Sequence, residues 1–424
     1  MTKDRAKRMQ RYKKRRIRRK RGNWFVRLKW WKKLLVVLAV IVVSVLCVGT
    51  WYVFSKWDKI DTQEIKTDDI IINKEVEDRF RELDLGTGYT NIALFGVDSR
   101  EGELGEGTRT DCIIVASLNN ETKEIKLASV YRDTLLDLSD GFTYQKCNAA
   151  YSYGGPATAI NMLNMNLDLN IQDYVTVDFG AIADAIDLLG GLELNITDEE
   201  AMYMNEHILG TGIAAGKEVH YMEHGGLQLL DGVQATTYAR IRSTAGGDFT
   251  RTERQRIVIE KVMEKVKDID MATLNKIIDK VFPQISTSFT LPEILNYAKG
   301  YKEYVLADSI GFPYQDALTL DSVPGVGSVV VPADLAANVI RLHQFLFGTM
   351  DYVPSSMVYT IDSNISTTLN NNTSSEMYSE DGYDILEEEE YVQDEQPLVG
   401  DTENGIDGDE GGYFGEGYTE GESQ

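Results

Sequence analysis

The residues of this chain with the clearest chemical potential are arginines between Thr237 and Arg256, in the stretch "TYARIRSTAGGDFTRTERQR". Five arginines stand there, in a chain whose formal net charge is -24. In "YARIR", Arg240 and Arg242 are two residues apart on a predicted strand, so their side chains would point to one face. So many guanidinium groups in an acidic protein indicate a local requirement for an anion.

A helix predicted to begin near Arg251 continues this set. The letters "TRTE" form a T-x-x-E capping box at its start. Arg251, Arg254 and Gln255 stand at i, i+3 and i+4, and the same rows lead into the apolar stripe of the helix. We therefore expect these three side chains on the buried face, where an unpaired charge is costly. Arg256 lies on the opposite side, with Glu260 one turn further on, and is predicted to form a solvated ion pair.

Arginine and aspartate also stand close together at the ends of three predicted apolar strands. The pairs are Asp98 and Arg100 after the first strand, Arg109 and Asp111 before the second, and Arg132 and Asp133 after the third. Each charge taken singly is explained by solvent exposure at a strand end. The repetition of the pairing makes a shared charged site an equally good interpretation.

Inward-facing arginines need an anion, and the sequence leaves two kinds open. One is an internal carboxylate such as Asp248. The other is a phosphate-bearing ligand, which arginine binds bidentately and which the positive end of a helix also favours. The two agree if Asp98 and Asp111 hold Mg²⁺, or Mn²⁺ in its place, on the same phosphates. Arginines and a bound metal around a diphosphate are what phosphoryl transfer requires.

The elements that must position these residues alternate between strand and helix. Strands are predicted at "NIALFGVD", "DCIIVASL", "IKLASV", "YVTVDF" and "LELNI", and helices at 156–167 and "GAIADAIDLLG". A strand at "GSVVVPA" and a helix at "LAANVIRLHQFLFG" follow later. This pattern predicts an α/β fold with a three-layer arrangement, in which helices flank a central mixed sheet.

The composition divides the chain into five parts. We expect a basic cytoplasmic head at 1–33, a transmembrane helix at 34–54, an extracellular stalk at 55–88, a catalytic domain at 89–350 and a disordered acidic tail at 351–424. The head carries seventeen Lys and Arg against one acid, and the 21 residues of 34–54 carry no charge. That length suits one membrane crossing, with the basic end in the cytoplasm and the domain outside the cell.

Other interpretations of these end segments are weaker. A cleaved signal peptide would have a shorter apolar run and an A-x-A site, which does not follow this one. The basic head could bind nucleic acid, but anionic lipid beside a membrane span explains it without a further partner. The domain itself is acidic, so no nucleic-acid partner is expected for it.

Two further patterns could indicate a metal site or a disulfide. The letters "HYMEH", from His220 to His224, match an H-x-x-E-H zinc pattern, but the segment lacks the helical periodicity that the motif needs. Cys112 and Cys147 could form a disulfide outside the cell, and unpaired thiols are the other interpretation.

Several motifs taken together resemble the LytR-CpsA-Psr family of Gram-positive cell-wall glycopolymer ligases. They are "NIALFGVDSR", "RTDCIIVASLNNETKEIKLASVYRDT", "KCNAAYSYGGP", "LLGGLELNI" and "LQLLDGVQATTYARIRSTAGGDFTRTERQR", which follow one another from about 90 to 270. The resemblance implies a membrane-anchored phosphotransferase. Such an enzyme attaches a glycopolymer, such as teichoic acid or capsule, from a polyprenyl diphosphate carrier to peptidoglycan through a phosphodiester.

The resemblance also implies roles for the charged residues named above. Asp98 and Asp111 would hold Mg²⁺, and Asp133 would orient the acceptor or act as base. The diphosphate would be bound by Arg109, Arg132, Arg240, Arg242, Arg251, Arg254 and Gln255. The catalytic residues would be Arg132, Asp133, Arg242 and Arg251. The prenyl chain would lie in an apolar pocket to which residues 155–195 contribute.

Two other functions remain compatible with the same residues. One is hydrolysis of lipid diphosphates, with water in place of the peptidoglycan hydroxyl. The other is a non-catalytic regulator of envelope maintenance that senses lipid carriers.

Overall fold

The structure is a computed structural model, and it describes residues 61–62, 65, 69–99 and 104–376. The predicted basic head, the transmembrane helix and residues 377–424 of the acidic tail lie outside these ranges. Within them, no helix is both long enough and apolar enough to cross a membrane.

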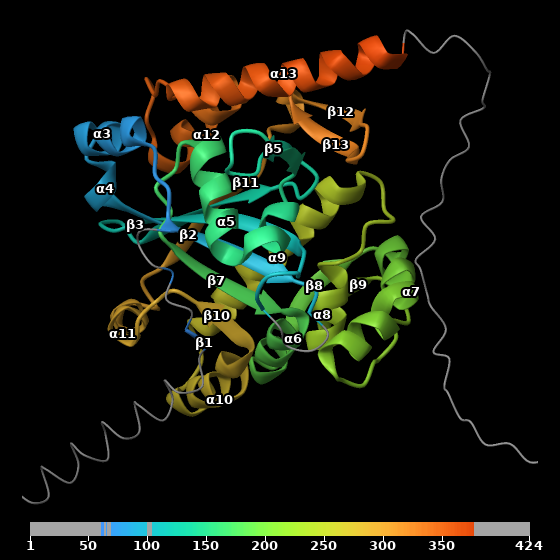
Figure 1. The fold of residues 1–424 in the computed structure, drawn as a ribbon. Coiled ribbons are helices and arrows are strands. Elements are labelled where there is room, and N and C mark those ends of the chain that lie inside the picture. The colour runs from blue at the N-terminus through green and yellow to red at the C-terminus, as the bar shows by residue number, and fades with distance from the viewer. Residues whose placement is uncertain (1–60, 63–64, 66–68, 100–103, 377–424) are drawn as a thin grey trace, which may run out of the picture. The chain divides into compact units, whose positions relative to one another are not determined.

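The centre of the described fold is a mixed sheet (Figure 1). Its seven strands, in spatial order, are β1 Asp61–Thr62, β10 Ile285–Thr287, β7 Asp173–Asp178, β2 Tyr89–Val97, β3 Thr110–Asn119, β4 Glu124–Val130 and β11 Val305–Phe312. Strand β3 is antiparallel to both β2 and β4, whereas β7 runs parallel to β2 and β11 runs parallel to β4. The predicted mixed sheet is confirmed, and so are the strands predicted for β2, β3, β4 and β7.

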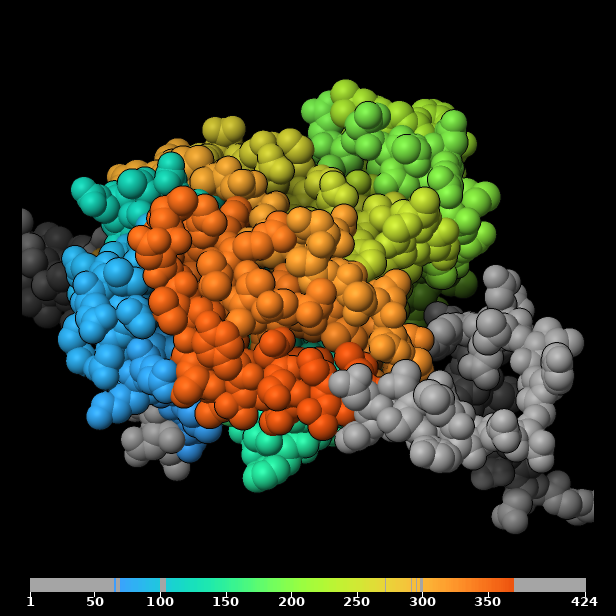
Figure 2. All heavy atoms as spheres, turned by 90° about the horizontal axis from the view of Figure 1, so that it is seen from above, coloured from blue at the N-terminus to red at the C-terminus, as the bar shows by residue number. Residues whose placement is uncertain are grey.

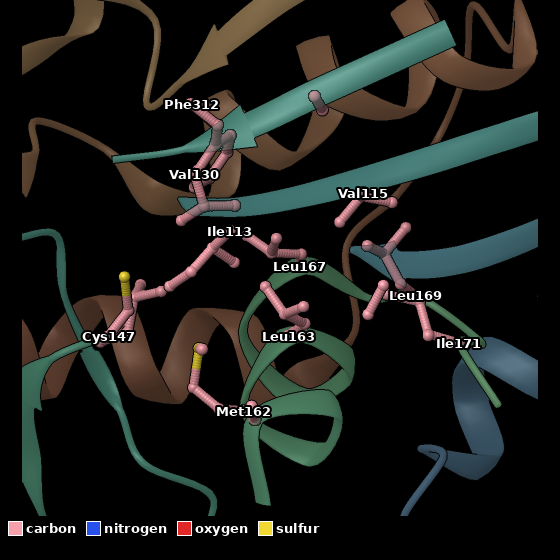
Figure 3. Close-up of a cluster of buried hydrophobic side chains, with 14 of the residues drawn as sticks. Ile113, Val115, Val130, Cys147, Met162, Leu163, Leu167, Leu169, Ile171 and Phe312 are labelled. Carbon is pink, nitrogen blue, oxygen red and sulfur yellow. The ribbon is translucent and has the colours of Figure 1, made fainter. Parts of the chain in front are cut away.

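Helices cover both faces of this sheet, because its central strands are apolar on both sides. Along β3, Ile113 and Val115 face one layer, whereas Ile114 and Ala116 face the other. The first layer contains α3 Lys74–Glu82, α4 Leu85–Gly88, α5 Ala149–Leu167, α12 Leu335–Phe347 and α13 Ser356–Glu376. Side chains of β3, β4, β11 and α5 meet in this layer (Figure 3). The second layer contains α9 Gly247–Val266, whose Ile259 packs on the sheet.

A second group of elements follows β7 and has its own apolar core. It consists of α6 Phe179–Leu188, β8 Leu192–Ile196, α7 Asp198–Ala215, β9 Gly226–Leu230 and α8 Gly232–Tyr238. The β8–β9 hairpin is separate from the main sheet. Ile186, Met204 and Ile241 are buried in this core, and Val258 of α9 joins it to the rest of the fold. This arrangement places α9 between the second core and the sheet.

The remaining elements are short or lie at the edge of the fold. They are β5 Leu135–Asp137, β6 Tyr144–Lys146, α10 Met271–Val281, η3 Phe282–Gln284, α11 Leu291–Lys299, η4 Gln315–Ala317, β12 Leu318–Val323 and β13 Gly327–Pro332. The strand and the helix predicted near the C-terminal end of the domain are confirmed as β13 and α12.

The folded region is larger at both ends than the sequence predicts. In the expected stalk, Val76, Phe80 and Leu85 are buried in the main core, and β1 pairs with β10. In the expected tail, α13 buries Ile361, and this orange segment lies against the blue segment that contains α3 (Figure 2). The backbone N–H of Ser356 donates to Glu75 between them. Both segments are rich in polar residues, and their few apolar side chains at helical spacing were too sparse to stand out.

Two predicted helix starts are displaced. Helix α5 begins at Ala149 and continues past a kink at Gly154 and Gly155, where a φ of +64° at Gly155 suits a residue without Cβ. Helix α9 begins at Gly247, so Asp248 lies in its first turn. The expected capping box at Thr250 is absent, because its hydroxyl donates to the carbonyl of Ala245 instead.

The two cysteines of the described region are thiols. Cys147 belongs to the first layer, and its Sγ lies 3.2 Å from the carbonyl oxygen of Tyr131. Cys112 belongs to the second layer, on the other face of the sheet. A disulfide between them is therefore not formed.

Candidate active site

The charged strand ends meet at one edge of the central sheet. Because β3 is antiparallel to both β2 and β4, its first residues lie beside the last residues of these neighbours. This edge carries Asp98 after β2, Asp111 near the start of β3, and Arg132 and Asp133 after β4. The sequence-based expectation that these residues lie together is confirmed for this set.

A β-bulge places Asp111 at this edge. Gly96 of β2 pairs with Cys112, whereas the next residue, Val97, pairs with Thr110, so Asp111 is the extra residue of β3. Bulges of this kind redirect one side chain out of the regular alternation. The carboxylate is thereby directed to the arginines rather than to either apolar layer.

Three arginines surround Asp111 and Asp248. Arg132 Nη1 lies 2.6 Å from Asp111 Oδ1, and Arg242 Nη2 lies 3.3 Å from the same oxygen. Arg251 Nη2 lies 2.6 Å from Asp248 Oδ1, and the Nε atoms of Arg132 and Arg242 each lie 3.8 Å from that oxygen. We call these five residues the arginine cluster; its formal charge is positive by one.

The arginine cluster has donor groups that the protein does not satisfy. Arg251 Nε and Nη1 and Arg132 Nε are buried and make no hydrogen bond to a described residue, and neither do the two buried carboxylate oxygens of Asp248, so the unpaired donors outnumber the unpaired acceptors. Buried donors are nearly always paired in folded proteins, and leaving one unpaired is costly. The cluster therefore has the chemistry of an anion-binding site.

The electrostatics of the cluster point the same way. Burial disfavours the charged form of Asp111, but the attraction of Arg132, Arg242 and Arg251 outweighs it and lowers the pKa of this carboxyl. Burial, together with repulsion from Arg251 and Arg132, lowers the pKa of Arg242 to about 10. Burial also lowers the pKa of Arg251, and repulsion from Arg132 adds to it. A bound anion would relieve this excess of positive charge.

Arg240 lies at the rim of the site and is held by three neighbours. Its Nη2 lies 3.5 Å from Asp98 Oδ2, and its Nη1 donates to the hydroxyl of Thr211 at 3.0 Å. The guanidinium carbon lies 3.9 Å from the centre of the Phe179 ring. Arg240 and Arg242 follow α8 in a turn and a loop, so the predicted strand for "YARIR" is wrong. The one-residue spacing nevertheless brings both arginines toward the strand-end carboxylates.

Arg254 differs from the predicted binding residues because its nitrogens bind the protein. Nε donates to Glu200, Nη1 to the carbonyl of Ile241 and Nη2 to the hydroxyl of Thr244. Helix geometry correctly predicted that Arg254 is buried. It did not predict that Glu200, Ile241 and Thr244 accept hydrogen bonds from its guanidinium group. Three of the five N–H groups of Arg254 are thus engaged by internal acceptors.

Two other predicted ligands of the diphosphate are not part of the arginine cluster. Gln255 is half-buried, and Arg109 is exposed beside the glycine-rich loop. For neither side chain does the structure show a hydrogen bond or ion pair with a described residue. Their predicted role rests on the family resemblance alone.

The predicted solvated position of Arg256 is wrong. Its side chain is half-buried and its Nη1 has no hydrogen-bond partner in the described part of the chain. Burial lowers the pKa of Arg256, with Tyr131 as the first group that counteracts this. Phe249, two turns earlier on the same side of α9, packs edge-on against Tyr131, with ring centres 4.6 Å apart. This side of the helix therefore faces the end of β4 rather than water.

The sequence does not predict the positions that Lys146 and Asp248 take in the site. Lys146 ends β6, and its Nζ lies 3.3 Å from Asp133 Oδ1. Its place at the start of "KCNAAYSYGGP" was the available signal. Asp248 has a larger part in the cluster than the sequence indicates, because it lies within ion-pair distance of all three arginines. The earlier start of α9 explains the difference.

Apolar residues of the second layer adjoin the arginine cluster at Cys112. Leu94, Ile125, Ile259 and Leu306 of this layer are only partly buried. By contrast, the apolar residues of α5 are fully buried in the first layer, and those of α6 and β8 lie in the second core. The expected contribution of 155–195 to an apolar pocket stays a prediction. The zinc-like segment His220–His224 is not helical, and His220 pairs with Asp231.

The comparisons with known proteins agree with the sequence motifs. A model described as the LytR_cpsA_psr family matches residues 52–319. The chain is 28% identical over 274 residues to the polyisoprenyl-teichoic acid–peptidoglycan teichoic acid transferase TagU of Bacillus licheniformis, covering 64% of this chain and 83% of that protein. It is 29% identical over 252 residues to biofilm regulatory protein A of Streptococcus mutans, covering 54% and 60%.

A solved structure supports the fold. Protein gbs0355 from Streptococcus agalactiae aligns with a TM-score of 0.54 at 22% identity, over 64% of this chain and 92% of that one. Since the family model spans well over half of the sequence, this chain belongs to the LytR-CpsA-Psr family.

Proposed function

We propose that this protein is a membrane-anchored phosphotransferase that moves a glycopolymer, such as teichoic acid or capsule, from a polyprenyl diphosphate carrier to a hydroxyl of peptidoglycan. The observation that carries the proposal is the set of buried, unsatisfied donors on Arg251 and Arg132 beside Arg242. Such donors match the oxygens of a diphosphate. The similarity to a named teichoic acid transferase supports the choice of donor and acceptor.

The arginine cluster suits the charge changes of this reaction. The acceptor hydroxyl attacks the phosphorus that carries the polymer, and a new phosphodiester P–O bond forms. The phosphoanhydride P–O bond breaks, so that polyprenyl phosphate leaves with the bonding electron pair. Arg132, Arg242 and Arg251 would hold the diphosphate and neutralise charge that builds on its oxygens.

Asp133 is placed to act on the acceptor. It lies beside the cluster, with its Oδ2 3.5 Å from Arg132 Nε and its Oδ1 3.3 Å from Lys146 Nζ. In this proposal it orients the hydroxyl and accepts its proton. Lys146 lies within ion-pair distance of one carboxylate oxygen, and the charge of Arg132 attracts the other without a hydrogen bond from Nε.

The donor set at the sheet edge fits Mg²⁺, or Mn²⁺ as a substitute. Asp98 and Asp111 offer carboxylate oxygens, and the hydrogen bonds and ion pairs that Asp111 makes with other described residues involve Oδ1. Among the described residues, no group of three or more metal-binding side chains is found. That suits Mg²⁺, which is usually bound by one or two carboxylates, substrate phosphates and water. The metal would supply further neutralisation of the phosphate oxygens.

The membrane supplies the context for a lipid-linked donor. We propose that 34–54 anchors the chain with its basic head in the cytoplasm and the domain outside the cell. The partly buried apolar residues of the second layer begin at Cys112, beside the cluster, and extend along the sheet to Ile125 and Leu306, which offers a place for the prenyl chain. The head group and the lipid tail would then bind to adjoining parts of one site.

Mass spectrometry and a transfer assay test this function. Full-length protein extracted from its membrane should carry polyprenyl phosphates or diphosphates. It should also transfer glycan from a polyprenyl diphosphate donor to peptidoglycan. Arg242→Ala should abolish transfer, whereas Arg81→Ala, at an exposed ion pair with Asp78, should not.

Three outcomes would point elsewhere. Protein that carries no polyprenyl species and does not react with the donor contradicts the proposal. Release of polyprenyl phosphate at the same rate without peptidoglycan identifies hydrolysis. Function in cells that survives Asp98→Ala favours a lipid-sensing regulator.

A further inference from the structure

The loop that carries Arg242 is held from behind by Arg254. Arg254 Nη1 donates to the carbonyl oxygen of Ile241 at 3.1 Å, and Nη2 donates to Thr244 Oγ1 at 2.6 Å. Ile241 immediately precedes Arg242 in the chain, and Thr244 follows it by two residues. One guanidinium group therefore fixes the backbone on both sides of an arginine of the site.

Arg254 is in turn fixed by Glu200. Its Nε lies 2.8 Å from Glu200 Oε1, and the side chains of Arg254 and Glu200 are 3% and 13% exposed. A charge-assisted hydrogen bond between two buried side chains is stronger than the same bond exposed to water, because the local dielectric constant is low. The hydrogen bond from Nε to Glu200 thus fixes the orientation of the guanidinium plane, and with it the directions of Nη1 and Nη2.

Glu200 is rigid because it also caps α7. Its Oε2 accepts the backbone N–H of Thr197 at 2.8 Å, while its own N–H donates to the hydroxyl of Thr197. This reciprocal capping box fixes the carboxylate at the first turn of the helix. The same carboxylate therefore links the start of α7 to α9 and, through Arg254, to the loop.

We propose that Glu200 is a positioning residue for the diphosphate site, which acts through Arg254 to hold Arg242 at the strand-end carboxylates. The inference rests on the proposed function, because it assigns Arg242 to the phosphates. Arg242 is the partner that needs such support. Its side chain is 39% exposed, and its contacts to Asp111 and Asp248 are 3.3 and 3.8 Å long.

The test uses the full-length protein in detergent micelles, with farnesyl diphosphate as a binding probe and the peptidoglycan transfer assay. Glu200→Gln removes the charge that orients Arg254 but is nearly isosteric. Affinity for farnesyl diphosphate and kcat/KM for the donor should each fall about 10- to 100-fold, as expected when a site group moves by about 1 Å. The donor KM should rise even at temperatures far below the melting temperature.

Two control variants separate positioning from helix stability and from charge. Thr197→Ala removes the capping hydroxyl but leaves Glu200 opposite Arg254. Because the backbone N–H of Thr197 still donates to Glu200 Oε2, this variant should lower the melting temperature but change the donor KM far less than Glu200→Gln does. Glu199→Gln makes the same charge change at an exposed neighbour and should change neither quantity.

Two further variants keep the test valid if Glu200→Gln folds poorly. Thr244→Val keeps the volume of the buried side chain but removes the acceptor for Arg254 Nη2, so it should also raise the donor KM. In Arg254→Lys the charge remains but one nitrogen cannot reach both acceptors. A double mutant of Glu200→Gln and Arg254→Lys should be no worse than Arg254→Lys alone, because the two residues act in series.

The outcomes that overturn the proposal differ from those that overturn the function. If wild-type protein binds farnesyl diphosphate and transfers glycan while Glu200→Gln and Thr244→Val match it, only the positioning role is refuted. Additive losses in the double mutant, or an equal KM change in Thr197→Ala, would refute it as well. If the wild type neither binds nor transfers, the function fails and the positioning role fails with it.

Discussion

Arg251 and Asp248 form an ion pair within the first turns of α9, with Arg251 Nη2 2.6 Å from Asp248 Oδ1. The side chain of Arg251 is 2% exposed, whereas that of Asp248 is 21% exposed. The pair engages one nitrogen of the guanidinium, and Nε and Nη1 have no hydrogen-bond acceptor within residues 69–99 and 104–376. Asp248 therefore keeps the buried arginine charged while its other donors remain available for a ligand.

Substitution of this pair should separate stability from activity. Arg251→Met leaves Asp248 without its closest cation, so unfolding should become easier by about 2 kcal/mol, less than for a fully buried pair. Transfer should fall by about 100- to 1000-fold, as for the loss of one preorganised donor to a transition state. Urea denaturation and the transfer assay measure the two quantities. The double variant with Asp248→Asn should recover stability but not transfer; recovery of both would contradict the role given to Arg251.

The proposed metal site predicts a cation requirement that depends on Asp98. Chelation should abolish transfer, and added Mg²⁺ should restore it. In Asp98→Asn, the Mg²⁺ concentration for half-maximal activity should rise by more than about 10-fold, since even an outer-shell partner can cost that much. Glu199→Gln, which is exposed and distant from the strand ends in sequence, is the control. An unchanged Mg²⁺ titration in Asp98→Asn would argue against this carboxylate as a ligand.

His343 should make the fold sensitive to acid. It is fully buried, its Nε2 lies 3.0 Å from the carbonyl oxygen of Leu167, and it stacks on Tyr352. Burial lowers its pKa from 6.5 to about 4. Between these values the unfolded chain binds a proton that the folded protein does not. The free energy of unfolding should therefore fall as pH drops from 6.5 to 4, by up to about 3 kcal/mol.

The neighbouring carboxyl group of Asp168 changes the pH dependence of stability in the opposite direction. The contribution of His343 is therefore measured by comparing the wild type with a His343 variant. Burial raises the pKa of Asp168, although Ser355 and Tyr352 donate hydrogen bonds to it. Because the folded protein binds a proton at this carboxyl more readily than the unfolded chain does, the free energy of unfolding rises as pH falls. Chemical denaturation of wild type and His343→Gln at pH 7 and pH 5 removes this common contribution. The wild type should lose more stability than the variant, and equal losses would refute the assignment to His343.

Two C-terminal truncations test where the folded region ends. Removal of 377–424 should leave the melting temperature of the domain unchanged. Removal of 356–424 also deletes Val358, Ile361 and Ile365, which are at most 2% exposed. At about 1.5 kcal/mol or more for each buried side chain, the loss should exceed about 4 kcal/mol. Equal melting temperatures for the two truncations would contradict a structural role for α13.

The amino-acid sequence by itself determined the family, the central strands and the charged residues at their ends. Apolar runs bounded by charges specify β2, β3 and β4, because alternation and turn chemistry are local properties. The short antiparallel connection around Asn119 then brings Asp111 and Arg132 to one edge with little further information. The burial of Arg251 and Arg254 also followed from helix geometry.

Only the tertiary structure decided what covers each face of α9. Periodicity gives the direction of a side chain relative to its own helix axis, but not the neighbour that it meets. Arg254 therefore meets Glu200 and the Ile241–Thr244 backbone, and Arg256 meets the end of β4 rather than water. The docking of α3 and α13 and the approach of Lys146 to Asp133 also depend on contacts between residues far apart in sequence. These long-range contacts bring Arg132, Arg242 and Arg251 together into one cluster.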